Sequence, residues 1–453
     1  MKTTFFIVCW LIGSLAHAQG SSKYFGATNT EAKLEYHSKI EIKSKYALKL
    51  SQLKVENGDN YEIFEEIRTQ VSFLIGHFSS ESFKAEVGVP GVLGENMNFT
   101  VTKVENFQGY SILHLKTVGK VVFHKDVFKG KSKARIPLRL PLSIERTYEL
   151  GIVDGVNRCT DEHYNSLGDF FYFWDIDKSG CPLKGNNREI VRVDGELTVI
   201  DNTKKTYPEY DKLYQKPVLD IRLLMGYIGD HISLNEVDYN DDGYLSFKGT
   251  VDELQSLGFK IVERKTKFRL SANDHELKGT NYLYVLEKEV RNNLGQTQIV
   301  RVTAFLGDTD INSKDLTFHK VLIPAYQEAD LLVYDGHSGL GANLSFDYLP
   351  EFTFDTTGKY QLFFINGCSS YPYYNGQFFR NKEGGSKNID IITSGLSTYT
   401  STSVSNTMAF LAPFVSGRTW SYQTLLRHME VSNGDAGTYL TGVNGDEDNL
   451  FQP

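Results

Sequence analysis

The chain has 453 residues and a formal net charge of −8, and it contains 26 Tyr, 29 Phe and 11 Pro. The acidic balance argues against a general nucleic-acid binder, because such proteins neutralise phosphates with basic surfaces, and against adhesion to anionic membranes by charge alone. The length favours two or three domains, and the many aromatic residues suit β-rich architecture.

The first eighteen residues have the pattern of a secretory signal peptide. Lys2 gives a short basic start, residues 5–15 are mostly apolar, and residues 16–18 (AHA) are the small-x-small pattern that signal peptidase reads. The apolar stretch is too short to remain as a membrane helix, and no later stretch reaches about 18 uninterrupted apolar residues. We therefore expect residues 1–18 to be removed and the mature chain to be exported, periplasmic or secreted, without a membrane span.

Residues 19–206 form the first expected domain, which is β-rich. Short segments alternate apolar and polar residues with a period of two and are separated by turn residues. These segments are residues 98–104, 110–115, 121–124 and 134–144. Such a pattern is typical of an antiparallel sandwich or barrel. One amphipathic helix, near Tyr61 to Phe78, is expected to pack against the strands.

Three cysteines remain after removal of the signal peptide, and an odd number in an oxidising compartment indicates a free thiol. Cys159 and Cys181 stand on either side of a compact aromatic segment. We expect them to form a disulfide that pins this segment, which leaves Cys368 unpaired. A zinc site made by Cys159, His163 and Cys181 is the alternative, since zinc binds Cys and His side chains.

From residue 207 the pattern changes to near-continuous apolar runs, which are typical of strands covered on both faces of a parallel sheet. The runs are residues 219–228, 259–263, 299–306, 329–334, 360–366 and 388–393. Helical candidates are residues 252–257, 314–327, 404–415 and 420–429. Strands alternating with helices predict a second domain of α/β class, residues 207–453, with a mostly parallel sheet. The polar C-terminal residues 444–449 are interpreted as a solvated tail.

Two of the expected buried strands are followed by reactive residues. The strand at residues 329–334 continues into residues 335–341 (DGHSGLG), and the strand at residues 360–366 continues into residues 367–370 (GCSS). In open α/β sheets, ligands bind at the carboxyl ends of the strands. If the two strands are neighbours, His337 and the unpaired Cys368 meet at that edge.

In these two segments the chain resembles the caspase–gingipain–legumain group of cysteine peptidases, which have one apolar strand ending in His-Gly and another ending in a small residue and Cys. Residues 367–370 are also similar to the nucleophile motif of separase-type relatives. The resemblance is close over residues 299–376. It implies a caspase-like fold for residues 207–453 and an endopeptidase that cleaves proteins or peptides through a His–Cys dyad, with no required cofactor.

The resemblance also implies a role for each residue. Cys368 is expected to be the nucleophile and His337 the general acid that protonates the leaving amine. The backbone N–H groups of Cys368 and of Ser338 or Gly339 are expected to hold the oxyanion. This chain departs from many relatives in having Ser338, where they have glycine, directly after the histidine.

Two other interpretations of the same residues stay open. Residues 336–338 (GHS) are similar to the start of the G-x-S-x-G elbow of serine hydrolases, although the fifth position is Leu340 and no helix-forming run follows at once. The second interpretation is that the second domain is a catalytically inactive scaffold in a surface or adhesion protein that binds a partner.

A second candidate site lies in residues 238–246 (DYNDDGYLS), which match the first nine positions of an EF-hand calcium loop, including glycine at position six. Asp238, Asn240, Asp242 and Tyr244 are the candidate ligands. Position twelve is Gly249, where an EF-hand has glutamate. The alternative to calcium binding is a polar turn between two strands.

Overall fold

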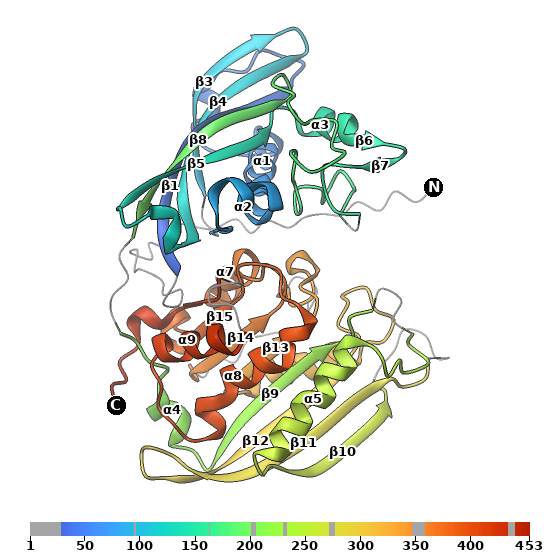
Figure 1. The fold of residues 1–453 in the computed structure, drawn as a ribbon, viewed down its shortest axis with the longest axis vertical. Coiled ribbons are helices and arrows are strands. Elements are labelled where there is room, and N and C mark those ends of the chain that lie inside the picture. Colours follow the sequence, from blue (N-terminus) through green and yellow to red (C-terminus); the bar gives the residue numbers. More distant parts are fainter. Residues whose placement is uncertain are drawn as a thin grey trace. The chain divides into compact units, whose positions relative to one another are not determined.

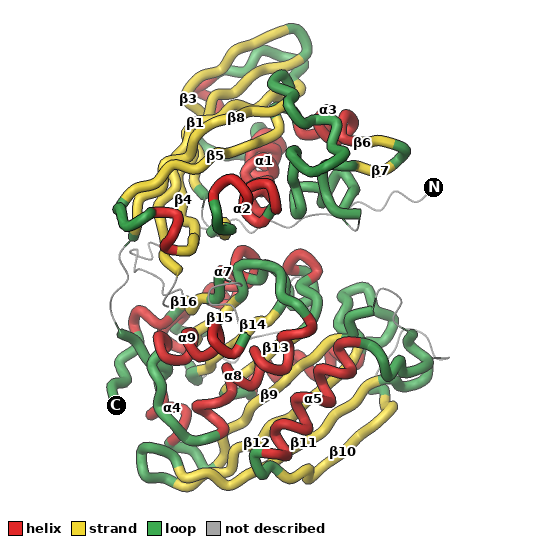
Figure 2. The backbone as a smooth tube through the Cα atoms, viewed as in Figure 1, coloured by secondary structure: helices red, strands yellow, loops and turns green. Residues whose placement is uncertain are grey.

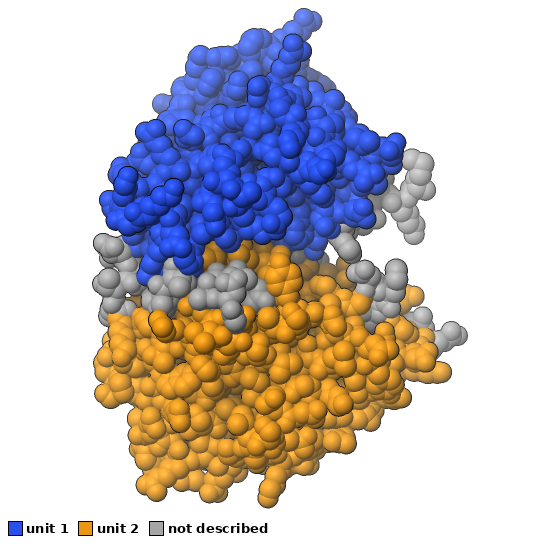
Figure 3. All heavy atoms as spheres, viewed as in Figure 1, with its two compact units in different colours: residues 1–17, 29–201 blue, residues 18–28, 202–453 orange. Residues whose placement is uncertain are grey.

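The structure is a computed structural model that describes residues 29–94, 97–162, 164–200, 205–229, 233–270, 277–346, 358–433 and 440–453. The expected signal peptide, residues 1–18, lies outside the described residues. The described chain falls into two compact units, which we call unit 1 (29–200) and unit 2 (205–453) (Figure 3). Each unit is treated separately below.

Unit 1 is built from one antiparallel sheet with helices packed on it (Figures 1 and 2). Its strands are β1 (Asn29–Lys43), β2 (Gly91–Leu93), β3 (Asn98–Phe107), β4 (Tyr110–His124), β5 (Lys133–Pro141) and β8 (Ile190–Val199), with a small hairpin of β6 (Ile152–Val153) and β7 (Val156–Asn157). Its helices are α1 (Tyr61–Ser79), α2 (Glu81–Val87) and α3 (Ile144–Gly151). The strand order is β2-β4-β1-β8-β5, with β3 also paired to β4.

The β-rich prediction for this region is confirmed, but a sandwich or barrel is not what forms. The six strands make one open sheet, and α1 packs against β1, β2 and β5 in place of a second sheet. Leu34 and Ile40 of β1 and Phe73 and Phe78 of α1 are all fully buried. Alternating strands reveal that one face is buried, but they do not reveal whether a sheet or a helix covers that face.

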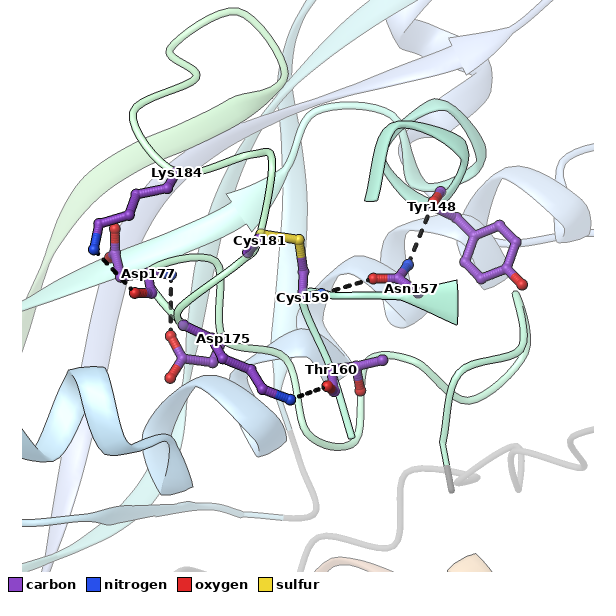
Figure 4. Close-up of a disulfide and its surroundings, with 9 residues drawn as sticks. Tyr148, Asn157, Cys159, Thr160, Asp175, Asp177, Cys181 and Lys184 are labelled. Carbon is purple, nitrogen blue, oxygen red and sulfur yellow. Dashed lines mark hydrogen bonds between the residues drawn. A yellow bond between two sulfur atoms is a disulfide. The ribbon is translucent and has the colours of Figure 1, made fainter. Parts of the chain in front are cut away.

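The aromatic segment is pinned as expected by a disulfide between Cys159 and Cys181, whose Cα atoms are 4.7 Å apart (Figure 4). Because both sulfurs are used in this bond, the zinc alternative is wrong; its third ligand, His163, lies outside the described residues. The segment faces inward: Phe170 and Trp174 are fully buried and pack edge-on against Phe73 of α1, with ring centroids 4.8 and 5.0 Å away. The disulfide therefore fastens part of the core of unit 1.

Unit 2 contains an eight-stranded sheet, and the helices labelled α4, α5, α7, α8 and α9 in Figure 1 belong to it. Its strands are β9 (Val218–Gly226), β10 (Lys260–Phe268), β11 (Asn281–Arg291), β12 (Thr297–Gly307), β13 (Leu331–Asp335), β14 (Gln361–Asn366), β15 (Ile389–Thr393) and β16 (Gly442–Asn444). Its helices are α4 (Tyr210–Tyr214), α5 (Asp242–Ser256), α6 (Thr317–Glu328), α7 (Tyr371–Asn381), α8 (Ser403–Val415) and α9 (Tyr422–Ser432).

The strand order is β10-β11-β12-β9-β13-β14-β15-β16, and the strands from β12 to β15 are parallel. Helices cover both faces of this parallel part. In β9, Leu223 packs into the core shared with α5, α8 and α9, whereas Leu224 packs into the core shared with α6 and α7. Burial of successive residues on opposite faces explains the near-continuous apolar runs in the sequence. The mixed α/β class is therefore confirmed, and the sheet itself is mixed, because β10, β11 and β16 pair antiparallel beside the parallel strands.

Three expectations for unit 2 are wrong in detail. Residues 259–263 were expected in a strand covered on both faces, but β10 is an antiparallel edge strand whose Val262 is 56% exposed. Strand β11, which pairs β10 with β12, has no counterpart in the sequence prediction. Helix α5 begins ten residues before the expected position 252. β10 is exposed along most of its length, so its sequence lacks the continuous apolar run of a strand that is buried on both faces.

The C-terminal residues are not a solvated tail. Asn444, Asp446 and Asn449 are buried, and Asn449 donates a hydrogen bond of 2.5 Å to the fully buried carboxylate of Asp390 on β15. No helix within the described parts of the chain is long and apolar enough to cross a membrane.

Candidate active site

The two strands that carry the candidate dyad are direct neighbours. β13 and β14 pair in parallel, with Asp335 opposite Asn366 at their carboxyl ends. His337 and Cys368 each follow two residues beyond that last pair. The segments also touch, since a Cβ atom placed on Gly367 would lie 3.2 Å from the carbonyl oxygen of Gly336. The register thus brings the segments that carry the two candidate residues to the same sheet edge.

This edge is also a point where the chain reverses its direction through the sheet. After β9 the chain forms β10, β11 and β12, which all lie on one side of β9. It then crosses to β13, which pairs with the other side of β9. Open α/β sheets bind their ligands at such switch points, outside the carboxyl ends of the strands. His337 follows one of the two strands that flank the switch point.

The imidazole of His337 is exposed and is held by the end of β9. Its Nε2 atom lies 3.0 Å from the carbonyl oxygen of Ile228. A carbonyl oxygen only accepts hydrogen bonds, so Nε2 carries the hydrogen, and in the neutral ring Nδ1 has the free lone pair. The ring therefore has one nitrogen fixed by the protein and the other available for proton transfer.

The backbone of His337 is fixed by two side chains. The buried hydroxyl of Tyr334 donates to its carbonyl oxygen over 2.6 Å, and the amide of Asn343 donates to the same oxygen over 2.9 Å. The next carbonyl, that of Ser338, accepts from the hydroxyl of Tyr374 over 2.8 Å. Burial raises the pKa of Tyr334 well above its usual value, so this phenol stays a donor throughout the physiological range.

Cys368 is the one free cysteine in the described residues, and its side chain is partly buried. The Sγ atom lies 3.8 Å from the carbonyl oxygen of Thr398 and 4.0 Å from its hydroxyl oxygen. The next residue, Ser369, has φ of 47°, and its N–H donates to the carbonyl of Leu396 over 3.1 Å. The turn that presents the thiol is therefore tied to the segment that follows β15.

Ser370 completes this turn as a structural residue. Its buried hydroxyl donates to the carbonyl of Ile365 over 2.9 Å and accepts from the N–H of Ser394 over 2.9 Å. The hydroxyl thus links the end of β14 to the end of β15. These hydrogen bonds assign Ser370 to positioning the turn.

A buried polar layer lies under the two segments. The carboxylate of Asp335 accepts from Ser403 over 3.0 Å and from Thr407 over 3.4 Å, both on α8. Beside it, the side-chain oxygen of Asn366 accepts from Asn406 over 2.7 Å. Burial raises the pKa of Asp335 to about 6, although its hydrogen-bond donors partly oppose this. Sequence reasoning missed this layer; the only signal was a polar residue at the end of each apolar run.

The backbone N–H groups proposed for the oxyanion belong to Cys368 and to Ser338 or Gly339. Within the described residues, no acceptor is found for the N–H of Ser338, Gly339 or Cys368. The Ser338 carbonyl instead accepts from the N–H of Gly341 over 2.9 Å. Gly339 has φ of +56°, a conformation that glycine adopts without a steric penalty.

The second candidate site does not assemble as a calcium loop. Asp242 and Tyr244 lie in the first turn of α5, and the carboxylate of Asp242 accepts from the hydroxyl of Thr400 over 2.8 Å. The carboxylate of Asp238 accepts from the N–H of Asn240 over 2.9 Å. In the described parts of the chain, no group of three or more His, Cys, Asp or Glu side chains is arranged to hold a metal ion. The calcium prediction therefore gains no support from this geometry.

Gly243 explains why the motif looked like a calcium loop. At position six of such a loop the glycine makes a sharp turn, but here Gly243 lies within α5. A Cβ atom on Gly243 would lie 2.0 Å from the carbonyl oxygen of Gly226. Glycine is needed because α5 passes very close to the end of β9.

No protein-family model matches this chain, and no curated protein is significantly similar to it. The geometry of the strand ends therefore carries the functional argument.

Proposed function

We propose that unit 2 is a caspase-like cysteine endopeptidase in which Cys368 is the nucleophile and His337 is the general acid and base. The observation that carries this proposal is the register of β13 and β14, which delivers both residues to one sheet edge, two positions beyond a paired Asp335 and Asn366. The resemblance of residues 299–376 to caspase-like peptidases agrees with that placement.

The proposed reaction uses the two side chains and one water molecule. Cys368 gives its thiol proton to His337, its sulfur bonds to the carbonyl carbon of the scissile peptide, and the oxygen takes up the electron pair of the C=O double bond. The N–H groups of Cys368 and of Ser338 or Gly339 stabilise that oxyanion. His337 protonates the leaving amine as the C–N bond breaks, which leaves a thioester. His337 then takes a proton from water, whose oxygen attacks the thioester and releases Cys368.

The proposed substrates are proteins or peptides outside the cytoplasm, in the periplasm or in the medium. The Cys159–Cys181 disulfide is compatible with export, because such bonds persist in oxidising compartments. The reaction as proposed includes no cofactor.

The direct test is cleavage of a mixed peptide pool by the mature chain, with the new ends identified by mass spectrometry. Wild type is expected to cut, whereas Cys368→Ala and His337→Ala are expected to be inactive while remaining folded. Asp238→Ala is a matched control, because Asp238 is hydrogen-bonded only to its own loop among the described residues. Cleavage that survives Cys368→Ala would contradict the proposal. A folded wild type that cuts nothing would favour an inactive scaffold that binds a partner.

A further inference from the structure

The carboxylate of Asp241 is hydrogen-bonded to the peptide group that binds the imidazole of His337. The side chain of Asp241 is 9% exposed and sits at the N-terminus of α5, directly before that helix begins. Its Oδ2 atom accepts from the N–H of Gly229 over 2.7 Å and from the N–H of Ile228 over 3.0 Å. Its Oδ1 atom accepts from the N–H of Tyr244 over 3.0 Å and caps the helix.

The hydrogen bonds of Asp241 and His337 meet on the same peptide group. The peptide between Ile228 and Gly229 donates its N–H to Asp241 over 2.7 Å and accepts, through its carbonyl oxygen, from Nε2 of His337 over 3.0 Å. The atoms of a peptide group are coplanar, with N–H and C=O pointing in opposite directions. A carboxylate that fixes the N–H therefore also fixes the direction of the carbonyl that orients the imidazole.

The carboxylate also changes the strength of that carbonyl as an acceptor. A hydrogen bond from an N–H to an ionised group is stronger than one to a neutral group, and consecutive hydrogen bonds polarise one another. Electron density drawn toward the Ile228 oxygen favours a ring that carries hydrogen on Nε2. Such a ring presents Nδ1 for proton transfer and tolerates the positive charge that it acquires when Nδ1 is protonated.

We propose that Asp241 is a positioning residue of the peptidase site and acts on His337 through the Ile228–Gly229 peptide. This inference rests on the proposed function. In a Ser-His-Asp triad, the aspartate carboxylate orients the imidazole directly. Asp241 would orient His337 in the same way, but through one intervening peptide group. Asp241 belongs to the segment that was first interpreted as a calcium loop.

The alternative is that Asp241 only caps α5 and has no effect on His337. Two substitutions separate the two roles. Asp241→Ser keeps a good helix cap, because a serine hydroxyl accepts well from the third backbone N–H, but it has no second oxygen for the Ile228 and Gly229 amides. Asp241→Asn keeps the shape of the side chain and removes its charge. Asp238→Ser is the matched control in the preceding turn, where Asp238 accepts from Asn240.

The measurement is the rate at which iodoacetamide alkylates Cys368 as a function of pH, which needs no peptide substrate. The thiolate is the form of Cys368 that displaces iodide. The pH at half-maximal rate therefore reports how well the site stabilises the thiolate. We expect His337→Ala to move this pH upward, and Asp241→Ser and Asp241→Asn to move it upward by about half to one pH unit. Asp238→Ser is expected to match wild type. The same Asp241 variants are expected to lower kcat by about tenfold or more with KM little changed, a part of the contribution of general acid–base catalysis.

The outcomes distinguish this inference from the function on which it rests. If His337→Ala leaves the alkylation profile unchanged, the dyad falls and this inference falls with it. If His337→Ala shifts the profile but both Asp241 variants retain the wild-type profile, the dyad stands and only the role of Asp241 is overturned. Nitrogen-15 NMR of the wild-type imidazole covers the case in which the variants fail to fold. Hydrogen on Nε2 of the neutral ring supports the inference, and hydrogen on Nδ1 overturns it.

Discussion

The cysteines of the two units have opposite surroundings. Cys159 and Cys181 in unit 1 are buried and joined in a disulfide. Cys368 in unit 2 is free and partly exposed, and it stands in a turn between two strand ends with histidine two residues beyond the neighbouring strand. The same side chain thus forms a cross-link in one region and, in the proposed function, is the nucleophile in the other.

What separates the two regions is the chemistry around the sulfur. In unit 1 the two sulfurs are bonded to each other, and the bond restricts a loop that packs on α1. In unit 2 the neighbours are backbone groups and hydroxyls, such as those of Thr398, above a polar layer that includes Asp335. A reactive thiol needs polar surroundings and access, whereas a structural one needs only burial. Four predictions test this difference, beginning with the largest expected effect.

The largest effect is expected from removal of the proposed dyad in unit 2. Cys368→Ala, His337→Ala and the double variant should each lose cleavage by at least about a thousandfold and to a similar extent, because groups that act as a unit are not additive. Thermal unfolding should change little, since the imidazole is exposed. Steady-state kinetics on one identified peptide measures the loss. A double variant that is much less active than either single variant would show that the two residues act independently.

The second effect concerns unit 1. The double substitution Cys159→Ala with Cys181→Ala removes the constraint on a loop with a sequence separation of 22 residues. In the chain-entropy model this lowers the free energy of unfolding by about 3 kcal/mol. Hydrogen exchange measured by mass spectrometry should show faster exchange in unit 1. Alkylation of Cys368 should stay at the wild-type rate, and a slower rate would contradict the separation of roles.

The third prediction is an opposite response of two buried residues, one in each unit, to acid. Burial lowers the pKa of His77 in unit 1 to about 4 and raises the pKa of Asp335 in unit 2 to about 6. The contribution of His77 to stability is therefore present above its ordinary pKa and is lost as the pH falls through 4. The contribution of Asp335 is present below its ordinary pKa and is lost as the pH rises through 6. Each amounts to at most about 3 kcal/mol.

Two substitutions check this response. His77→Gln should reduce the loss of stability of unit 1 between pH 6.5 and 4, because glutamine does not titrate and can still donate to the Pro137 carbonyl that lies 2.9 Å from Nε2 of His77. Asp335→Asn should flatten the opposite trend in unit 2 between pH 4 and 6. Hydrogen exchange at several pH values follows both units in one sample. Equal pH dependence in wild type and variant would show that the residue does not control the trend.

The smallest effect is expected from Ser370→Ala. The substitution leaves the buried N–H of Ser394 without the acceptor that now lies 2.9 Å away, so unit 2 should lose about 1–2 kcal/mol of stability. Cleavage should fall far less than in Cys368→Ala. Chemical denaturation measures the stability, with Ser401→Ala as a control at an exposed position. A loss of activity as large as that of Cys368→Ala would give Ser370 a direct role in the reaction.

The sequence was most informative where a local pattern has one physical cause. The runs at 329–334 and 360–366 predicted β13 and β14 because both faces of each strand are buried. The odd cysteine count predicted the disulfide and the free Cys368. The helix expected near Tyr61 to Phe78 became α1, with its end displaced by one residue.

The sequence was least informative where the deciding contact is distant. Gly243 was interpreted as a turn residue, but it is required by the Gly226 carbonyl on another strand. The alternation in unit 1 did not show that α1 would cover the sheet. Asp241 contacts Ile228 and Gly229, whose amides come together with its carboxylate only in the folded chain.

The sequence by itself therefore determined which strands of the parallel sheet are buried on both faces, which cysteines pair and which side chains stand at the ends of those strands. These properties follow from local composition and from the period of two or 3.6 residues. Only the tertiary structure decided that β13 lies between β9 and β14, and this places the Ile228 carbonyl on one side of His337 and the turn of Cys368 on the other. Strand order depends on the sum of many weak contacts between distant segments, and no single segment records that sum.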